Sequence, residues 1–369
     1  MPFDKNQIKS SIIESASGIK FKIGGYLPDP EDSRDYQYSS GRFQKGKLPP
    51  KVDLREYMTE VEQQGELNSC TANAMAGAYE YLAMRELGES GQVSRLFVYY
   101  NARAINDRTD QDKGTYLRNC IKVLRKYGTC RESTWPYEPE KVFEEPHETA
   151  YEEASNYLLK EARRVNIDLF EMKHCLAEGY PFAFGMRLYS GFKKAGRNGG
   201  KVSLPDPDSE KSLGGHAMLC VGYSETDKVF LVRNSWGEEW GDEGYCYIPY
   251  DYMTNPEFTA DCWMVVSVAD LDFSEGVWGD STSFFDAILP LVEGVSEDDE
   301  DGEYEDDEDA EYEDDEEQGF DDEEEEEDDD NEDDYQEDDD DDDEEEEDDE
   351  DDEDDDEDEY EDDDDEEEE

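Results

Sequence analysis

Cys70 stands at a position where a reactive thiol could form. From Cys70 onward, apolar residues recur at helical spacing through residue 83, so the cysteine lies at the expected start of a helix. Ser69, immediately before it, is of a residue type preferred at helix N-caps. Unpaired backbone N–H groups and the positive end of the helix dipole favour the thiolate there, which is the reactive form. An isolated helical cysteine is more often a buried core residue, so its interpretation depends on the partners that the chain supplies.

A thiolate nucleophile needs a base, and the base needs a group that orients it. The chain has three histidines. His216 follows two glycines and begins an expected strand, whereas His147 lies in an acidic loop and His174 lies inside an expected helix. Asn234 lies at the end of the next expected strand, and a short turn between the two strands would bring it near His216. Its side-chain oxygen can accept a hydrogen bond from one imidazole nitrogen and leave the other for the cysteine, while Trp236 shields that bond from water.

Helix-like segments come first along the chain and strand-like segments come later, which predicts an α+β protein with two lobes. Residues 154–164 fit either a short helix or a loop. A long loop at residues 187–215 leads into the strand that carries His216, and loops of this length are often functional. We expect helices at residues 70–87, 95–104, 116–127 and 169–178, and strands at residues 181–188, 216–223, 229–234, 244–248 and 264–269.

Several motifs agree in their order and spacing. Gln64 lies six residues before Cys70 in QGELNSC, and His216 lies 146 residues after Cys70. Asn234 opens the segment NSWGEEWGDEGY, and the segments LPPKVDLRE and YGTCRESTWPY complete the set. Over about residues 48–270, these motifs resemble the papain/cathepsin family of cysteine peptidases, peptidase C1. The chain resembles a compact microbial-type member with an acidic C-terminal tail.

The resemblance implies a papain-like two-lobed fold, in which a helical lobe packs against an antiparallel β-barrel-like lobe. It implies a cysteine endopeptidase in which Cys70 attacks the peptide carbonyl, His216 serves as acid and base, and Asn234 orients His216. Gln64 and the backbone N–H of Cys70 would stabilise the oxyanion. The resemblance also implies a substrate-binding role for four residues: Gly114, Thr115, Gly215 and Trp236.

Two alternatives stay open at this point. The chain could be a catalytically silent papain-fold protein that binds partners through the cleft and the acidic tail. Gly114 and Thr115 equally fit a turn that caps the following helix. The family's usual Cys-Gly-Ser-Cys-Trp pattern is replaced here by LNSCT. Leu67 therefore excludes the family's disulfide at that position, and Thr71 alters the helix-side wall of the site.

Charge divides the chain into a folded part and a tail. Residues 296–369 hold 62 Asp or Glu and no Lys or Arg, which leaves 47 acidic against 33 basic residues in 1–295. Such a tail cannot bury apolar area and repels itself, so we expect disorder. It either adds solubility alone, binds basic proteins or divalent cations weakly, or competes with basic substrates at the enzyme's surface. The expected organisation is an N-terminal extension or short pro-segment at 1–47, removable or cleft-covering, a peptidase domain at 48–273, a connector at 274–295 and the tail.

The composition also bounds the partners and the compartment. No run approaches the roughly 18 apolar residues of a membrane span, and the N-terminus has no signal-peptide pattern. The seven cysteines are widely spaced without a CxxC pair, so we expect mostly free thiols, no metal site and a cytoplasmic protein. The negative charge opposes nucleic-acid binding. We expect a monomer that acts on protein or peptide substrates without a cofactor and away from membranes.

Overall fold

The computed structural model describes residues 10–15, 18–40, 47–87 and 91–268. The expected connector and acidic tail lie outside the described residues, as does the end of the expected peptidase domain beyond residue 268.

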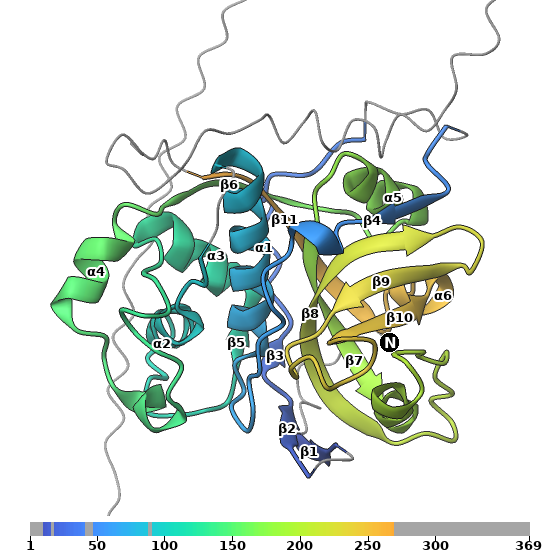
Figure 1. Cartoon of the computed structure of the whole chain (residues 1–369), viewed down its shortest axis with the longest axis horizontal. Coiled ribbons are helices and arrows are strands. Elements are labelled where there is room, and N and C mark those ends of the chain that lie inside the picture. The colour runs from blue at the N-terminus through green and yellow to red at the C-terminus, as the bar shows by residue number, and fades with distance from the viewer. Residues whose placement is uncertain (1–9, 16–17, 41–46, 88–90, 269–369) are drawn as a thin grey trace, which may run out of the picture. The chain divides into compact units, whose positions relative to one another are not determined.

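One antiparallel sheet contains seven strands, of which all but β4 come after residue 158 (Figure 1). The strands are β4 (Lys51–Asp53), β6 (Leu159–Arg164), β7 (Phe182–Tyr189), β8 (Ser212–Ser224), β9 (Val229–Arg233), β10 (Tyr245–Pro249) and β11 (Thr259–Val268). They are hydrogen-bonded in the order β10–β9–β8–β7–β11–β6, and β4 pairs with β8. Because β4, β7 and β9 all pair with it, β8 is the central strand.

Helix α1 (Cys70–Leu87) packs against β8 and lies between the sheet and the other helices of its lobe (Figure 1). Its side chains from residue 70 to 85 are buried on every face of the helix, apart from half-buried Met84. A helix that is buried all round belongs to a core, and its small residues allow close neighbours. The remaining helices are α2 (Arg95–Ala104), α3 (Leu117–Lys126), α4 (Glu148–Ala154), α5 (Leu169–Ala177) and α6 (Tyr250–Met253).

Most elements lie where the sequence predicts them, and α1 and α2 have the predicted bounds. The interpretation of residues 154–164 as a helix or loop is wrong, because α4 ends at Ala154 and β6 follows it. The sequence of β6, LKEARR, lacks β-branched residues, but pairing with β11 supplies its backbone partners. Tertiary pairing therefore overrides local propensity here. The predicted strands at 216–223 and 264–269 are also too short, since β8 and β11 begin four and five residues earlier.

The N-terminal extension packs against the domain. Its elements are β1 (Ser11–Glu14), β2 (Lys20–Ile23) and β3 (Tyr26–Leu27), and β3 pairs in parallel with β5 (Thr115–Tyr116). Tyr26 is fully buried, and a Cβ atom at Gly185 of β7 would lie 1.9 Å from its ring. The sheet therefore has a glycine where Tyr26 inserts.

Buried charges fix the part of the extension that follows Tyr26. Arg164 of β6 donates hydrogen bonds to Asp35 at 2.7 Å and to Asp29 at 3.1 Å, both in the extension. It also donates to Asp261 of β11 at 3.0 Å, and Tyr26 Oη donates to Asp261 at 2.5 Å. Burial and the neighbouring charge of Asp261 raise the pKa of Asp29 to about 7. Removing one member of such a buried network costs about 3–5 kcal/mol, so the extension is firmly held.

We predict that Gly185→Ala disturbs this packing. The added methyl group occupies space taken by the Tyr26 ring, so unfolding free energy should fall by about 1–3 kcal/mol. Trypsin should also cut faster within residues 18–40, as followed by mass spectrometry alongside urea unfolding. Gly91→Ala is the control, because no atom lies within 4 Å of its added Cβ. Equal stability and equal cleavage in Gly185→Ala and wild type would contradict the described insertion of Tyr26.

Candidate active site

Cys70 lies at the N-terminus of α1 and is fully buried. Burial raises the pKa of its thiol to about 12, while hydrogen bonds from the backbone of Ala217 and Thr71 act in the opposite direction. Ala217 follows His216 on β8. The contact with Ala217 therefore brings the thiol beside the strand that carries the histidine.

The β8–β9 hairpin brings His216 and Asn234 together. Leu219 of β8 lies opposite Arg233, the last residue of β9, and Asn234 comes directly after it. His216 Nε2 lies 2.8 Å from Asn234 Oδ1. The backbone N–H of Ser235 donates to the same oxygen at 2.9 Å, which fixes the orientation of the amide. The buried Nδ1 of His216 has no hydrogen-bond partner among the described residues, so this nitrogen is available to a reacting group.

Trp236 covers the imidazole of His216. The two ring centroids are 4.9 Å apart, with an angle of 31° between the ring planes. Burial lowers the pKa of His216 to about 4, although its hydrogen bond with Asn234 acts to raise it. In the described structure, burial therefore disfavours the charged form of both groups, the His216 imidazolium and the Cys70 thiolate.

Gln64 links the histidine side of the site to the cysteine side. Its Oε1 accepts a hydrogen bond from Ser235 Oγ at 2.6 Å, and Ser235 is the neighbour of Asn234. Its Nε2 donates to the carbonyl of Leu67 at 2.8 Å and to the carbonyl of Lys22 at 3.1 Å. One hydrogen of the amide is thus engaged by the N-terminal extension.

The extension also covers residues predicted to bind substrate. The carbonyl of Gly215 accepts a hydrogen bond from Gly24 N at 2.9 Å. Phe21 stacks on Trp236, with ring centroids 5.3 Å apart and 15° between the planes. These contacts place residues 21–24 directly over the histidine side of the site.

The other two predicted substrate residues contact the same segment. Thr115 N donates to the carbonyl of Gly25 at 3.0 Å. A Cβ atom at Gly114 would lie 2.1 Å from that carbonyl, so glycine is needed for the close approach. Gly114 precedes β5, and Thr115 belongs to it, so both residues border a strand pairing and not merely a turn before α3.

Two residues that support the site were missed from the sequence. Asp112 accepts hydrogen bonds from Asn68 N at 2.9 Å and from Lys22 Nζ at 2.8 Å. Tyr137 Oη donates to the carbonyl of Gln64 at 3.0 Å and lies 2.5 Å from Ser69 Oγ. Asp112 lies in a polar loop without a distinguishing pattern. Tyr137 ends the motif YGTCRESTWPY, which is the signal that could have identified it.

Comparison with known proteins gives consistent matches over this region. Residues 48–264 match the model of the papain family cysteine proteases. An uncharacterized peptidase C1-like protein of Acanthamoeba polyphaga mimivirus is 36% identical over 231 residues, covering 59% of this chain and 73% of that protein. Cathepsin J of Mus musculus is 30% identical over 213 residues, and the match spans 56% of this chain but only 61% of the cathepsin.

A solved structure gives a similar result. Xylellain, a cysteine protease from Xylella fastidiosa, superposes with a TM-score of 0.62 at 37% sequence identity. The match covers 66% of this chain and 96% of that chain.

We predict that Phe21→Ala uncovers Cys70. Loss of the ring that stacks on Trp236 weakens the local packing of the extension, so the open state becomes more populated. Alkylation of Cys70 by iodoacetamide should accelerate about tenfold or more, since truncating a buried Phe costs about 3–5 kcal/mol. Peptide mapping by mass spectrometry measures the rate. Ile12→Ala in the same extension is the control, because Ile12 is exposed. Equal rates in all three proteins would show that Phe21 does not control access.

Proposed function

This chain belongs to the papain family of cysteine proteases and is a cysteine endopeptidase, and we propose that its reaction is carried out by four residues: Cys70, His216, Asn234 and Gln64. The observation that supports these roles best is the 2.8 Å hydrogen bond between His216 Nε2 and Asn234 Oδ1. It fixes the ring of His216 and leaves Nδ1 for the thiol. The alternative from the sequence, a silent binding protein, gains no support from any contact at this site.

The proposed reaction begins when the Cys70 thiolate attacks the carbonyl carbon of the scissile peptide bond. The carbonyl oxygen becomes an oxyanion, and Gln64 Nε2 and the backbone N–H of Cys70 stabilise it. Protonated His216 gives its proton to the leaving amine, the C–N bond breaks, and a thioester on Cys70 remains. Neutral His216 then takes a proton from water, whose oxygen attacks the thioester carbon. The C–S bond breaks, the acid product leaves, and the Cys70 thiolate and protonated His216 are restored.

We infer that the described state is a covered, resting form of the enzyme. Burial disfavours both ions of the pair, because it raises the pKa of the Cys70 thiol and lowers the pKa of His216. Displacing residues 20–25 would admit water, relieve this desolvation and let the thiolate–imidazolium pair form. The same displacement would free Gln64 Nε2 from the carbonyl of Lys22. Substrate entry and activation of the nucleophile would then be one event.

The substrate is a protein or peptide, as in the rest of the family. We propose further that the enzyme is monomeric and cytoplasmic. We also propose that all seven cysteines remain free thiols, since each of them is unpaired and buried. None of the helices in the described ranges has both the length and the hydropathy of a membrane span. The weak binding of basic proteins or divalent cations by the tail stays a prediction from the sequence.

We predict that Cys70→Ala abolishes peptide hydrolysis while leaving the fold intact, because no other group supplies the thioester. A fluorogenic peptide assay and circular dichroism measure the two properties. A variant that still cleaves peptides at a measurable fraction of the wild-type rate would overturn the assignment of the nucleophile. A folded wild-type protein that cleaves no peptide in a broad library, with or without Phe21→Ala, would favour the silent binding protein.

We predict that Gln64→Ala lowers kcat by about 10²–10³-fold, the usual effect of losing one oxyanion donor. The alkylation rate of Cys70 should not fall, because alkylation forms no oxyanion. The neighbouring Gln63→Ala is the matched control, since the side chain of Gln63 is exposed. Equal kcat values for the two variants would refute an oxyanion role for Gln64.

A further inference from the structure

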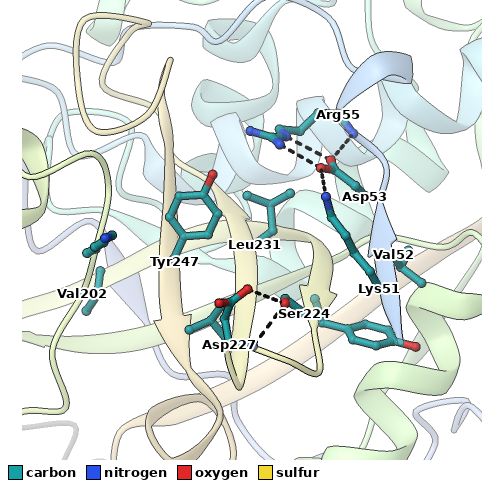
Figure 2. A pocket seen from close by; sticks show the side chains of 12 residues that line it. Lys51, Val52, Asp53, Arg55, Val202, Ser224, Asp227, Leu231 and Tyr247 are labelled. Carbon is teal, nitrogen blue, oxygen red and sulfur yellow. Dashed lines mark hydrogen bonds and ion pairs between the residues drawn. The ribbon is translucent and has the colours of Figure 1, made fainter. Parts of the chain in front are cut away.

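A groove lies on the sheet lobe, and none of its lining residues belongs to the proposed catalytic set. It has a volume of about 640 Å³. Figure 2 shows it as an opening between β4 on one side and the segment of Val202 on the other, with Leu231 and Tyr247 between them. The lining residues are Lys51, Val52, Asp53, Arg55, Lys201, Val202, Tyr223, Ser224, Asp227, Val229, Leu231 and Tyr247.

The groove combines an apolar floor with cations at its rim. Leu231 of β9 and Tyr247 of β10 are directly paired across the two strands, and the leucine side chain and the tyrosine ring both line the groove (Figure 2). Lys51 stands at one side with its side chain 66% exposed, and exposed Lys201 stands beside Val202 at the other. Such a site suits a ligand that has an aromatic ring between negative charges.

The acidic groups of the groove are already engaged, which leaves the two lysines available. Asp53 accepts hydrogen bonds from Arg55 at 2.7 and 3.0 Å (Figure 2). Asp227 accepts a hydrogen bond from Ser224 at 2.6 Å. The ion pair between Lys51 and Asp53 is loose at 3.7 Å, and Lys201 has no ion pair with any residue that the structure describes. Three further exposed cations precede Lys201 in the same segment: Lys193, Lys194 and Arg197.

The chain itself carries a repeated ligand of this chemistry. The pentapeptide EYEDD occurs three times in the acidic tail, at residues 303–307, 311–315 and 359–363. Each copy places one tyrosine between two glutamates. The first copy starts 35 residues after Val268, the last described residue. An extended chain of that length reaches about 120 Å, several times the length of β11, so the groove is within reach.

We propose that this groove binds the tyrosine-centred acidic repeats of the chain's own tail. The tyrosine ring packs on Leu231 and Tyr247, and the flanking carboxylates pair with Lys51 and Lys201. Three tethered copies raise the effective concentration of the motif to the millimolar range or above, so weak individual contacts suffice. The pairing is partly exposed, so it weakens with added salt.

The test measures binding of a fluorescein-labelled peptide, residues 301–316, to the full-length chain by fluorescence anisotropy. All proteins carry Cys70→Ala, which prevents cleavage of the peptide. Replacing Tyr304, Tyr312, Tyr335 and Tyr360 with Ser keeps the charge of the tail but removes its rings. This variant should bind the added peptide about tenfold more tightly than the parent, because the internal competitor is weakened. Equal affinity would show that the tail does not occupy the groove.

The groove residues are tested by substitutions in the variant whose tail lacks tyrosine. Lys51→Ala with Lys201→Ala should weaken peptide binding at least tenfold. Lys122→Ala with Lys126→Ala on α3 removes two exposed lysines elsewhere and should change it less than twofold. A peptide with both tyrosines replaced by Ser should also bind at least tenfold more weakly. Equal effects of the two lysine pairs, or equal binding of the two peptides, would reduce the interaction to general charge attraction and overturn the proposal. No binding at low salt would also overturn it.

Discussion

The site depends on the register of β9 against β8. Only this register brings Asn234, the residue after β9, to within 2.8 Å of His216 Nε2. A buried ion pair stabilises this register, because Arg233, the last residue of β9, donates a hydrogen bond to Glu62 at 2.7 Å and both side chains are buried. Since strand residues alternate between faces, a slip of one residue would turn Asn234 away and carry Arg233 into its place. A buried ion pair, although costly to desolvate, therefore helps to hold Asn234 in the position from which it orients His216.

The sequence predicted the central helix, α1, with its observed bounds and supplied the proposal for the residues of the site. Gln64, Cys70, His216 and Asn234 could be proposed from the sequence because each belongs to a short motif with a fixed spacing, and α1 was predicted because its apolar pattern is long. The extension was harder to interpret. The local sequence KFKIGGYL does not predict that Tyr26 packs over a glycine of β7 or that Gly24 donates a hydrogen bond to Gly215. Both contacts join segments about 160–190 residues apart in the chain. β6 was missed for the same reason: the residues LKEARR do not favour a strand by themselves, and pairing with the distant strand β11 stabilises it.

We infer that the site has two electrostatic states, one with the extension in place and one with it displaced. While Phe21 covers Trp236, Cys70 and His216 are both fully buried, and a low-dielectric environment favours the neutral pair. Once water enters, the helix N-terminus and the imidazole act in the same direction and favour the thiolate. The extension is held at Tyr26 and Asp29 by buried contacts with Asp261 and its neighbours, whereas residues 20–25 contact the site through the Phe21 ring, the Lys22–Asp112 ion pair and backbone hydrogen bonds. Local opening of that stretch is therefore less costly than release of the whole extension.

The pH dependence of Cys70 alkylation tests the central claim most directly, namely that Cys70 and His216 act as one ionised pair in the open state. Alkylation proceeds through that state even when it is rare, so its pH profile reports the thiolate fraction there. In the full-length wild type, the rate should remain measurable and nearly flat from neutral pH down to about pH 5, because imidazolium stabilises the thiolate. In His216→Ala, the rate should fall tenfold per pH unit below the ordinary thiol pKa of about 8.5. Superimposable profiles for the two proteins would contradict the ion pair.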